Sequence, residues 1–271
     1  MEITSPANPR IKQLVALRRR RVRDEAGVTL VEGYEELELA LAAGIKPRQI
    51  FLSPEIIDKG QQRLADVAAE RGAEVFTVSP AVFKKAAYRE SPDGWLAVVP
   101  AVGGELSGVE LGAKPLVVIC QGVEKPGNLG AILRTADAAG VAAVIATDPV
   151  TDWGNPNVIR ASKGTVFSVP VAAASSEQVL GWLADNSIRL VATTPGAEAL
   201  LTEGDFSGPT AIAVGSEKYG LPDEWLARAD VLVRIPMFGR ADSLNVATSA
   251  AIVCYEAVRQ RAPWARTPSG G

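Results

Sequence analysis

Histidine is absent from this 271-residue sequence, and cysteine occurs only twice, at Cys120 and Cys254. The chain therefore has no Ser-His-Asp triad, no histidine general base and no histidine metal ligand. The two cysteines lack the spacing of a metal or redox motif, so we expect buried, reduced thiols. Chemistry must rely on Arg, Lys, Ser, Asn, Asp, Glu or Tyr side chains or on backbone groups, and we expect no metal site.

Long hydrophobic runs are also missing. No apolar stretch approaches the roughly 20 residues that a membrane-spanning helix needs. The N-terminal segment has no signal-peptide pattern, so we expect a cytoplasmic protein without a membrane partner. A composition of 47% hydrophobic and 22% charged residues is typical of one or two globular domains with a sizeable core.

Positive charge is concentrated near the N-terminus, although the formal net charge is −3. Residues 10–23 contain no acidic side chain, and their cationic residues are Arg10, Lys12, Arg18, Arg19, Arg20, Arg21 and Arg23. Such a run is either a solvated helix face or a patch that binds phosphate groups. The residues alone leave both interpretations open.

The first half of the chain alternates helical and strand-like segments, which predicts a small α/β domain over residues 1–105. Helices are expected at 5–24, 34–43, 56–71 and 80–87, and strands at 28–33, 50–53, 74–78 and 95–99. A glycine-rich linker follows at 106–113.

The second half contains continuous apolar runs of the kind found in strands buried on both faces. Strands are expected at 115–120, 142–146, 166–170, 188–192, 210–214 and 231–236, and helices at 128–139, 156–163, 176–186, 225–229 and 243–261. The pattern predicts a mostly parallel sheet with helices on both faces over 114–262, with a flexible tail at 263–271.

Three loops follow the carboxyl ends of predicted buried strands, where open α/β sheets bind ligands. They span 121–130, 214–222 and 235–245. None has the pattern of a dinucleotide-binding loop or a P-loop. In the first, Asn128 is either a helix cap or a functional side chain. Arg134 is either a solvated helical side chain or, because its neighbours are apolar, a partly buried and functional arginine. In the second, Gly215 allows close approach of a ligand, and Glu217 could orient an arginine.

Taken together, the three loops resemble the signature motifs of the SpoU/TrmH family of RNA 2′-O-ribose methyltransferases. The matching segments are NLGAILRTADAAG at 128–140, GSEKYGLP at 215–222, and IPM at 235–237 followed by SLNV at 243–246. Their order and spacing also match. The resemblance covers residues 115–261 strongly and extends more weakly to the family's substrate-binding domain in the first half. Lys218 departs from the family pattern, in which glycine is commoner at this position.

The resemblance implies an α/β domain with a C-terminal trefoil knot, an exception to the rule that chains avoid knots. S-adenosylmethionine would bind bent in the knot, held mainly by backbone groups. By motif position these groups belong to Gly215, Ile235 and Leu244, with Thr193 as a weaker candidate. Members of the family are usually homodimers whose active site takes residues from both subunits.

The resemblance also assigns catalytic roles. Arg134 would activate the ribose 2′-hydroxyl, and further side chains would position Arg134, the cofactor or the RNA: Asn128, Glu217, Ser243 and Asn245. Because arginine stays protonated, it is a poor proton acceptor. We therefore expect Arg134 to clamp the adjacent phosphate, while the proton passes to that phosphate or to water. No metal is required.

The expected substrate is RNA. The RNA-contacting residues would be Arg10, Arg18, Arg19, Arg20 and Arg21. A 23S ribosomal RNA is the first expectation and transfer RNA the alternative. A non-catalytic RNA-binding or ribosome-assembly protein of the same fold is a rival interpretation, as is a small-molecule methyltransferase. The sequence identifies neither the target nucleotide nor whether the modification serves housekeeping or antibiotic resistance.

Overall fold

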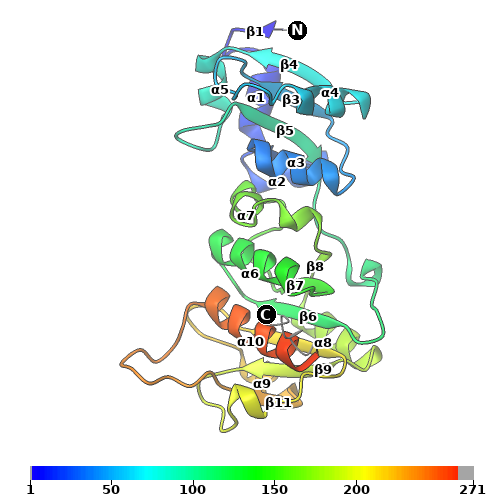
Figure 1. The fold of residues 1–271 in the computed structure, drawn as a ribbon, viewed down its shortest axis with the longest axis vertical. Coiled ribbons are helices and arrows are strands. Elements are labelled where there is room, and N and C mark those ends of the chain that lie inside the picture. The colour runs from blue at the N-terminus through cyan, green and yellow to red at the C-terminus, as the bar shows by residue number, and fades with distance from the viewer. Residues whose placement is uncertain (1, 262–271) are drawn as a thin grey trace, which may run out of the picture. The chain divides into compact units, whose positions relative to one another are not determined.

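A computed structural model describes residues 2–261. By internal packing, the chain divides into two compact units (Figure 1). Unit 1 comprises Met1–Gly103 and Asp152–Ser168, and unit 2 comprises Gly104–Thr151 and Val169–Gly271. The expected flexible tail at 263–271 lies outside the described residues.

The composition of unit 1 differs from the sequence-based division. Residues 152–168 were assigned to the second domain, but they group with the first. Within this segment, α7 (Pro156–Ala161) packs on β2 (Val28–Glu32). The hydroxyl of Thr29 also donates a hydrogen bond to the carbonyl of Gly154. A segment distant in sequence therefore completes unit 1, which local patterns do not reveal.

Unit 1 contains a five-stranded mixed sheet in the order β1-β4-β3-β5-β2. The remaining strands are β1 (Glu2–Ile3), β3 (Gln49–Leu52), β4 (Glu74–Val78) and β5 (Trp95–Pro100). The helices are α1 (Pro9–Ala16), α2 (Arg20–Ala26), α3 (Tyr34–Ala42), α4 (Arg63–Glu70) and α5 (Pro80–Ala86), with α7 added from the distant segment. The β5 strand runs antiparallel to both β2 and β3, whereas β1 and β3 run parallel to β4.

The helix expected at 5–24 is in fact two helices, α1 and α2. The side chain of Asn8 caps the start of α1 by accepting a hydrogen bond from the backbone N–H of Arg10 at 2.9 Å. At its end, the guanidinium of Arg23 donates to the carbonyls of Leu17 and Arg18 at 3.2 and 3.1 Å. These carbonyls thus gain side-chain partners at the point where the helical path breaks.

The helix expected at 56–71 is also shorter than predicted, because α4 begins only at Arg63. The preceding residues form turns, in which the side-chain oxygen of Gln61 accepts from the indole N–H of Trp95 at 2.9 Å and the backbone N–H of Asp58 at 3.3 Å. Trp95 is fully buried, so its polar N–H requires a partner, and a turn supplies it.

Unit 2 contains a six-stranded, entirely parallel sheet in the order β11-β9-β10-β6-β7-β8. The strands are β6 (Leu116–Gln121), β7 (Ala143–Thr147), β8 (Val171–Ala174), β9 (Arg189–Thr193), β10 (Thr210–Val214) and β11 (Val231–Val233). One strand prediction is wrong: the apolar run at 166–170 overlaps the 3-10 turn Thr165–Phe167, and the strand starts afterwards at Val171. Val166 and Val169 are buried, so the run reflects burial without strand pairing.

Helices cover both faces of this sheet, as the sequence predicted. Val117 and Ile119 of β6 share a buried cluster with α8 (Ser176–Asp185) and with Trp225 of α9 (Asp223–Arg228). Because side chains alternate along a strand, Val118 and Cys120 face the opposite side. There α6 (Pro126–Ala138) and α10 (Val246–Arg261) pack side by side (Figure 1).

Both cysteine thiols are free and buried, as expected. Burial raises the pKa of Cys254 to about 12 and raises that of Cys120 as well. In the part of the chain that the structure describes, no helix has the length and apolar character needed to cross a membrane.

Candidate functional site

A cavity of about 850 Å³ lies in unit 2 at the carboxyl ends of β9, β10 and β11. Its wall is formed mainly by three segments, which follow these strands at 193–195, 214–223 and 235–246. Sites for drug-sized ligands typically measure about 300–1,000 Å³. The cavity is therefore large enough for a nucleoside-sized ligand, and its position agrees with ligand binding at the carboxyl ends of parallel strands.

The four residues that the motifs assigned to cofactor binding all line this cavity: Thr193, Gly215, Ile235 and Leu244. The hydroxyl of Thr193 donates to the carbonyl of Ala213 at 2.7 Å and so joins β9 to β10. Contact of these residues with a cofactor remains a prediction.

Gly215 is required by the packing of the chain itself. A methyl group added at this position would overlap the backbone of Gly220 and Leu221. The sequence suggested that a ligand approaches Gly215 closely, and the structure adds that the following loop does so. Backbone hydrogen bonds close this loop between Ser216 and Gly220 in both directions, at 3.1 and 2.9 Å. The glycine therefore sets the position of the loop that carries Glu217.

Three polar side chains join the three motif loops beside the cavity. The amide of Asn128 donates to the carboxylate of Glu217 at 2.5 Å, and the amide of Asn245 donates to the side-chain oxygen of Asn128 at 3.1 Å. The other oxygen of Glu217 accepts from the backbone N–H of Glu124 at 3.4 Å. Glu217 thus accepts from both Glu124 and Asn128, and Asn128 in turn accepts from Asn245, so one set of hydrogen bonds links the three loops.

The carboxylate of Glu217 is held in its charged form. Burial raises the pKa of this group, but hydrogen bonds from the backbone and from Asn128 outweigh burial and lower the pKa below its ordinary value. A charged Glu217 can only accept hydrogen bonds. It therefore fixes the orientation of the Asn128 amide, which in turn presents its oxygen to Asn245.

The helix ends explain how these residues are positioned. Asn128 is not a helix cap, because α6 begins at Pro126 and Lys125 occupies the capping position. Asn245 instead lies directly before α10, where its side-chain oxygen accepts from the backbone N–H groups of Ala247 and Thr248 at 2.9 and 3.4 Å. Asn245 thus caps α10 with its oxygen and reaches Asn128 with its nitrogen.

Ser243 lies on the cavity wall, and its hydroxyl donates to the carboxylate of Asp242 at 3.3 Å. Both residues belong to the exposed loop between β11 and α10. Of the five proposed catalytic residues, the structure places four in or beside the cavity region: Asn128, Glu217, Ser243 and Asn245.

Arg134 is different. The sequence suggested a partly buried side chain, but Arg134 is exposed and does not line the cavity. Within residues 2–261 its guanidinium makes no hydrogen bond or ion pair. It lies six residues beyond Asn128 on α6, which is about 9 Å along the helix axis and on another face. The apolar neighbours of Arg134 face the core, and the arginine does not.

The basic run near the N-terminus is less free than its sequence implies. Arg18 donates to the carbonyls of Lys85, Ala86 and Ala87 at the end of α5, at 2.9, 3.2 and 2.6 Å. Its guanidinium also lies 5.3 Å from the ring centroid of Tyr88. This arginine therefore satisfies carbonyls that the helix leaves unpaired.

Other cations of the run pair with carboxylates or rings. Arg20 contacts Asp24 and Asp152 at 3.5 and 3.8 Å, and Arg21 contacts Glu25 at 2.7 Å. The guanidinium of Arg10 lies 4.7 Å from the ring centroid of Phe76. Arg19 is exposed and has no ion pair among the described residues. The acidic partners lie outside residues 10–23, so inspection of that segment alone did not reveal them.

Several cavity-lining residues were not selected from the sequence: Lys125, Tyr219, Leu226, Met237 and Ser249. Tyr219 and Met237 lie within the quoted motifs, so their position was the available signal. Leu226 comes from α9, and only the fold brings it to the cavity. Among the described residues, no group of three or more Cys, Asp or Glu side chains is arranged to hold a metal ion.

Comparison with known proteins agrees with this architecture. The model of the SpoU rRNA Methylase family matches residues 115–255, which is more than half of the chain. A second model, the MRM3-like substrate binding domain, matches residues 8–97. The two matched segments correspond to the parallel sheet of unit 2 and to most of unit 1.

Relatives match over nearly the full length. A 23S rRNA (uridine(2479)-2′-O)-methyltransferase from Streptomyces viridochromogenes is 32% identical, over 94% of this chain and 91% of the relative. A solved RNA 2′-O ribose methyltransferase is 44% identical with a TM-score of 0.84, covering 96% and 99% of the two chains. An AdoMet-bound rRNA methyltransferase from Sinorhizobium meliloti is 32% identical with a TM-score of 0.88, covering 96% and 97%. The chain therefore belongs to the SpoU rRNA methylase family.

Proposed function

We propose that this protein transfers a methyl group from S-adenosylmethionine to the 2′-hydroxyl of a ribose in RNA. The observation that carries the proposal is the hydrogen-bonded set of Asn128, Glu217 and Asn245, which joins the three family motifs beside one cavity. A binding protein that had lost its activity would have no need to keep these three side chains in register.

The residues of the cavity fit the proposed cofactor. The volume of about 850 Å³ suits a nucleoside with an amino-acid arm. Thr193, Gly215, Ile235 and Leu244 would hold it, chiefly through backbone groups and apolar contact. When bound, S-adenosylmethionine supplies an electrophilic methyl group on a sulfonium. The solved relative from S. meliloti was obtained with this cofactor.

The position of Arg134 supports a homodimer. Its side chain is exposed and does not reach the cavity of its own chain, so we infer that Arg134 acts at the cavity of a second copy. The α10 helix presents two exposed apolar side chains, Ile252 at 37% and Tyr255 at 41% exposure. These could pack between copies beside α6, the helix that carries Arg134.

In this mechanism the residues of the chain bind and orient the RNA. Arg134 would clamp the phosphate next to the target ribose, since guanidinium groups match phosphate geometry. The positive charge also favours the developing alkoxide, and the proton would leave to that phosphate or to water. Asn128, Glu217, Ser243 and Asn245 would hold the ribose and the loop in line with the methyl group. Much of the acceleration would come from this alignment.

Ribosomal RNA is the proposed target class, and 23S rRNA the specific proposal. The S. viridochromogenes relative, which matches along almost its whole length, modifies 23S rRNA. In unit 1, cations suited to the RNA backbone and without an ion pair among the described residues include Arg19, together with Lys12 and Lys85 beside a groove lined by both α1 and α5. Arg10, Arg18, Arg20 and Arg21 remain proposed contacts, although each already has an intramolecular partner.

The proposal is tested by transfer of labelled methyl groups to size-fractionated total RNA that lacks the modification. We expect label in the 23S rRNA fraction with the wild-type protein and loss of label with Arg134→Ala. Label confined to the transfer RNA fraction would reject the ribosomal target. Absence of label from every RNA, in a protein that still binds the cofactor, would reject the enzymatic function.

A further inference from the structure

We propose that Tyr219 and Phe238 are stacking platforms for unpaired RNA bases at the mouth of the cofactor cavity. The inference rests on the proposed function and adds a substrate class, namely a target nucleotide in a single-stranded region. Two large aromatic side chains are exposed on the two loops that line this cavity, Tyr219 at 75% and Phe238 at 96%.

Tyr219 is presented by a closed loop. Its backbone N–H donates to the hydroxyl of Ser216 at 3.2 Å, inside the turn that Ser216 and Gly220 close with two backbone hydrogen bonds. Tyr219 itself lines the cavity. The ammonium of Lys218 lies 4.8 Å from the centroid of its ring. The ring is thus held at the cavity rim with a cation beside it.

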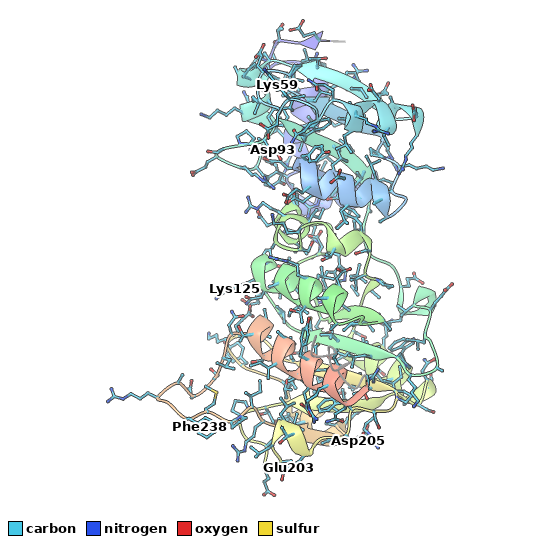
Figure 2. The ribbon with its side chains drawn as sticks, in the orientation of Figure 1. Lys59, Asp93, Lys125, Glu203, Asp205 and Phe238 are labelled. Atoms are coloured by element: carbon cyan, nitrogen blue, oxygen red, sulfur yellow. The ribbon has the colours of Figure 1, made fainter. Side chains whose placement is uncertain are left out.

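Phe238 lies on the other loop and does not itself line the cavity. It lies in the segment that extends from the sheet between β11 and α10 (Figure 2). Its neighbour Met237 lines the cavity, and so does Asp242, four residues after Phe238. Arg240, two residues away, is exposed. Each exposed ring therefore has a cation within two residues, and both loops contribute to the wall of the same cavity.

This combination matches the chemistry of single-stranded RNA. Exposed rings offer flat apolar faces on which bases stack, and neighbouring cations suit the phosphates between those bases. In a duplex the base faces are already stacked and cannot reach the rings. The flanking Lys218 and Arg240 favour an anionic partner over an apolar surface of a second copy. An unpaired nucleotide could place its ribose at the cavity while adjacent bases stack on Tyr219 and Phe238.

The test compares the full-length wild-type protein with Tyr219→Ala and Phe238→Ala. Binding is measured to an unstructured oligoribonucleotide and to an RNA duplex of the same length. Stacking contributes enough that each alanine variant should lose about five- to hundredfold in affinity for the single strand. Affinity for the duplex should not change. Tyr219→Phe and Phe238→Trp, which keep a ring, should retain binding of the single strand.

Two further measurements test whether weaker RNA binding has another cause, namely a damaged cofactor site or a lost subunit contact. Calorimetric titration with S-adenosylhomocysteine should give the wild-type affinity for Phe238→Ala, since Phe238 does not line the cavity, and for Tyr219→Phe, which keeps the ring. Sedimentation should give the same mass for all variants. Single-strand affinity equal to wild type in both alanine variants would overturn the inference. So would a fall in mass for Phe238→Ala, because Phe238 would then pack on a second copy.

The inference and the proposed function can fail separately. Unchanged single-strand binding by the alanine variants, in a protein that does methylate RNA, overturns the stacking inference alone. Loss of single-strand binding in the variants of a wild-type protein that methylates no RNA supports the stacking surface and overturns the proposed enzymatic function.

Discussion

At the scale of single residues, Arg23 differs from the other arginines of the N-terminal run. Its side chain is only 4% exposed and pairs with Asp152 at 2.8 Å, while also donating to the carbonyls of Leu17 and Arg18. A buried charge left without its partner is strongly destabilising. The pair therefore joins the break between α1 and α2 to the distant segment that completes unit 1.

We predict that Asp152→Ala lowers the free energy of unfolding by about 3–5 kcal/mol, because Arg23 would remain buried and unpaired. Urea denaturation followed by circular dichroism measures this change. The control is Glu25→Ala, which breaks the exposed pair with Arg21 and should leave stability within experimental error. Equal effects of the two substitutions would contradict this assignment.

Glu217 gives a prediction about pH. Because hydrogen bonds lower its pKa in the folded protein, the carboxylate stabilises the folded site above the ordinary glutamate pKa. This contribution is lost as the pH falls through the lowered folded value. Binding of S-adenosylhomocysteine should therefore be constant around neutral pH and weaken only at acid pH, below the ordinary glutamate range. Calorimetry across this range measures it.

The matched variant is Glu217→Gln, which keeps the size of the side chain but cannot lose a charge. It should bind the cofactor analogue more weakly near neutral pH, since the amide nitrogen cannot accept from Glu124. It should also lack the acid transition. A wild-type profile identical to that of Glu217→Gln would rule out a role for this carboxylate.

The sequence revealed more of the hydrogen-bonded set beside the cavity than of the contacts that stabilise the fold. Asn128, Glu217 and Asn245 were found because each lies in a motif with its own spacing. The contacts of Arg23 and Arg18 were not, since Asp152 and the end of α5 are 129 and about 69 positions away in the chain. Partners at such separations leave no local pattern, so a paired arginine and a free arginine look the same.

At the scale of elements, the two arginines at the junction of α1 and α2 have different roles. Arg18 donates to three carbonyls at the end of α5, whereas Arg19 is exposed and has no ion pair within residues 2–261. Arg19→Ala should weaken RNA binding and flatten its dependence on salt, because one phosphate contact is lost. Arg18→Ala should mainly lower the thermal stability of unit 1.

Filter binding over a range of salt concentrations and thermal denaturation measure the two effects. If Arg19→Ala binds RNA with the wild-type salt slope, this residue does not contact the phosphate backbone. The charge-preserving variant Arg19→Lys should retain the slope, since the contact depends on charge.

Elements with clear ends were predicted well. The strands β6, β9 and β10 lie within one residue of their predicted positions, and the helices α3 and α6 end where glycines follow them. Predictions were wrong where tertiary contacts decide the outcome. The Arg23 side chain binds a carbonyl where α1 ends. A turn that contains Gln61 stands where a longer α4 was expected to begin. The buried Val166 and Val169 lie in and beside a 3-10 turn.

At the scale of the whole molecule, the proposed dimer makes a distinctive prediction about mixed subunits. Arg134 and the cavity residues would act at a shared site but belong to different copies. Arg134→Ala and Glu217→Ala should each be inactive alone. Refolding the two variants together should recover methyl transfer, because each heterodimer contains one site with an intact Arg134 and an intact Glu217.

The control is refolding of each variant by itself, which should recover nothing. If the mixture is as inactive as the separate variants while sedimentation shows that heterodimers form, Arg134 and Glu217 act within one chain. The composite site would then be wrong, although the family membership would stand.

The central claim is that the methyl group goes to a ribose 2′-oxygen, and the most direct measurement locates it. Deproteinised 23S rRNA would be incubated with labelled S-adenosylmethionine and the protein, then hydrolysed with alkali. A 2′-O-methyl group blocks cleavage of the following phosphodiester, so we predict label in an alkali-resistant dinucleotide. Label in ordinary mononucleotides would place the methyl group on a base and contradict the account.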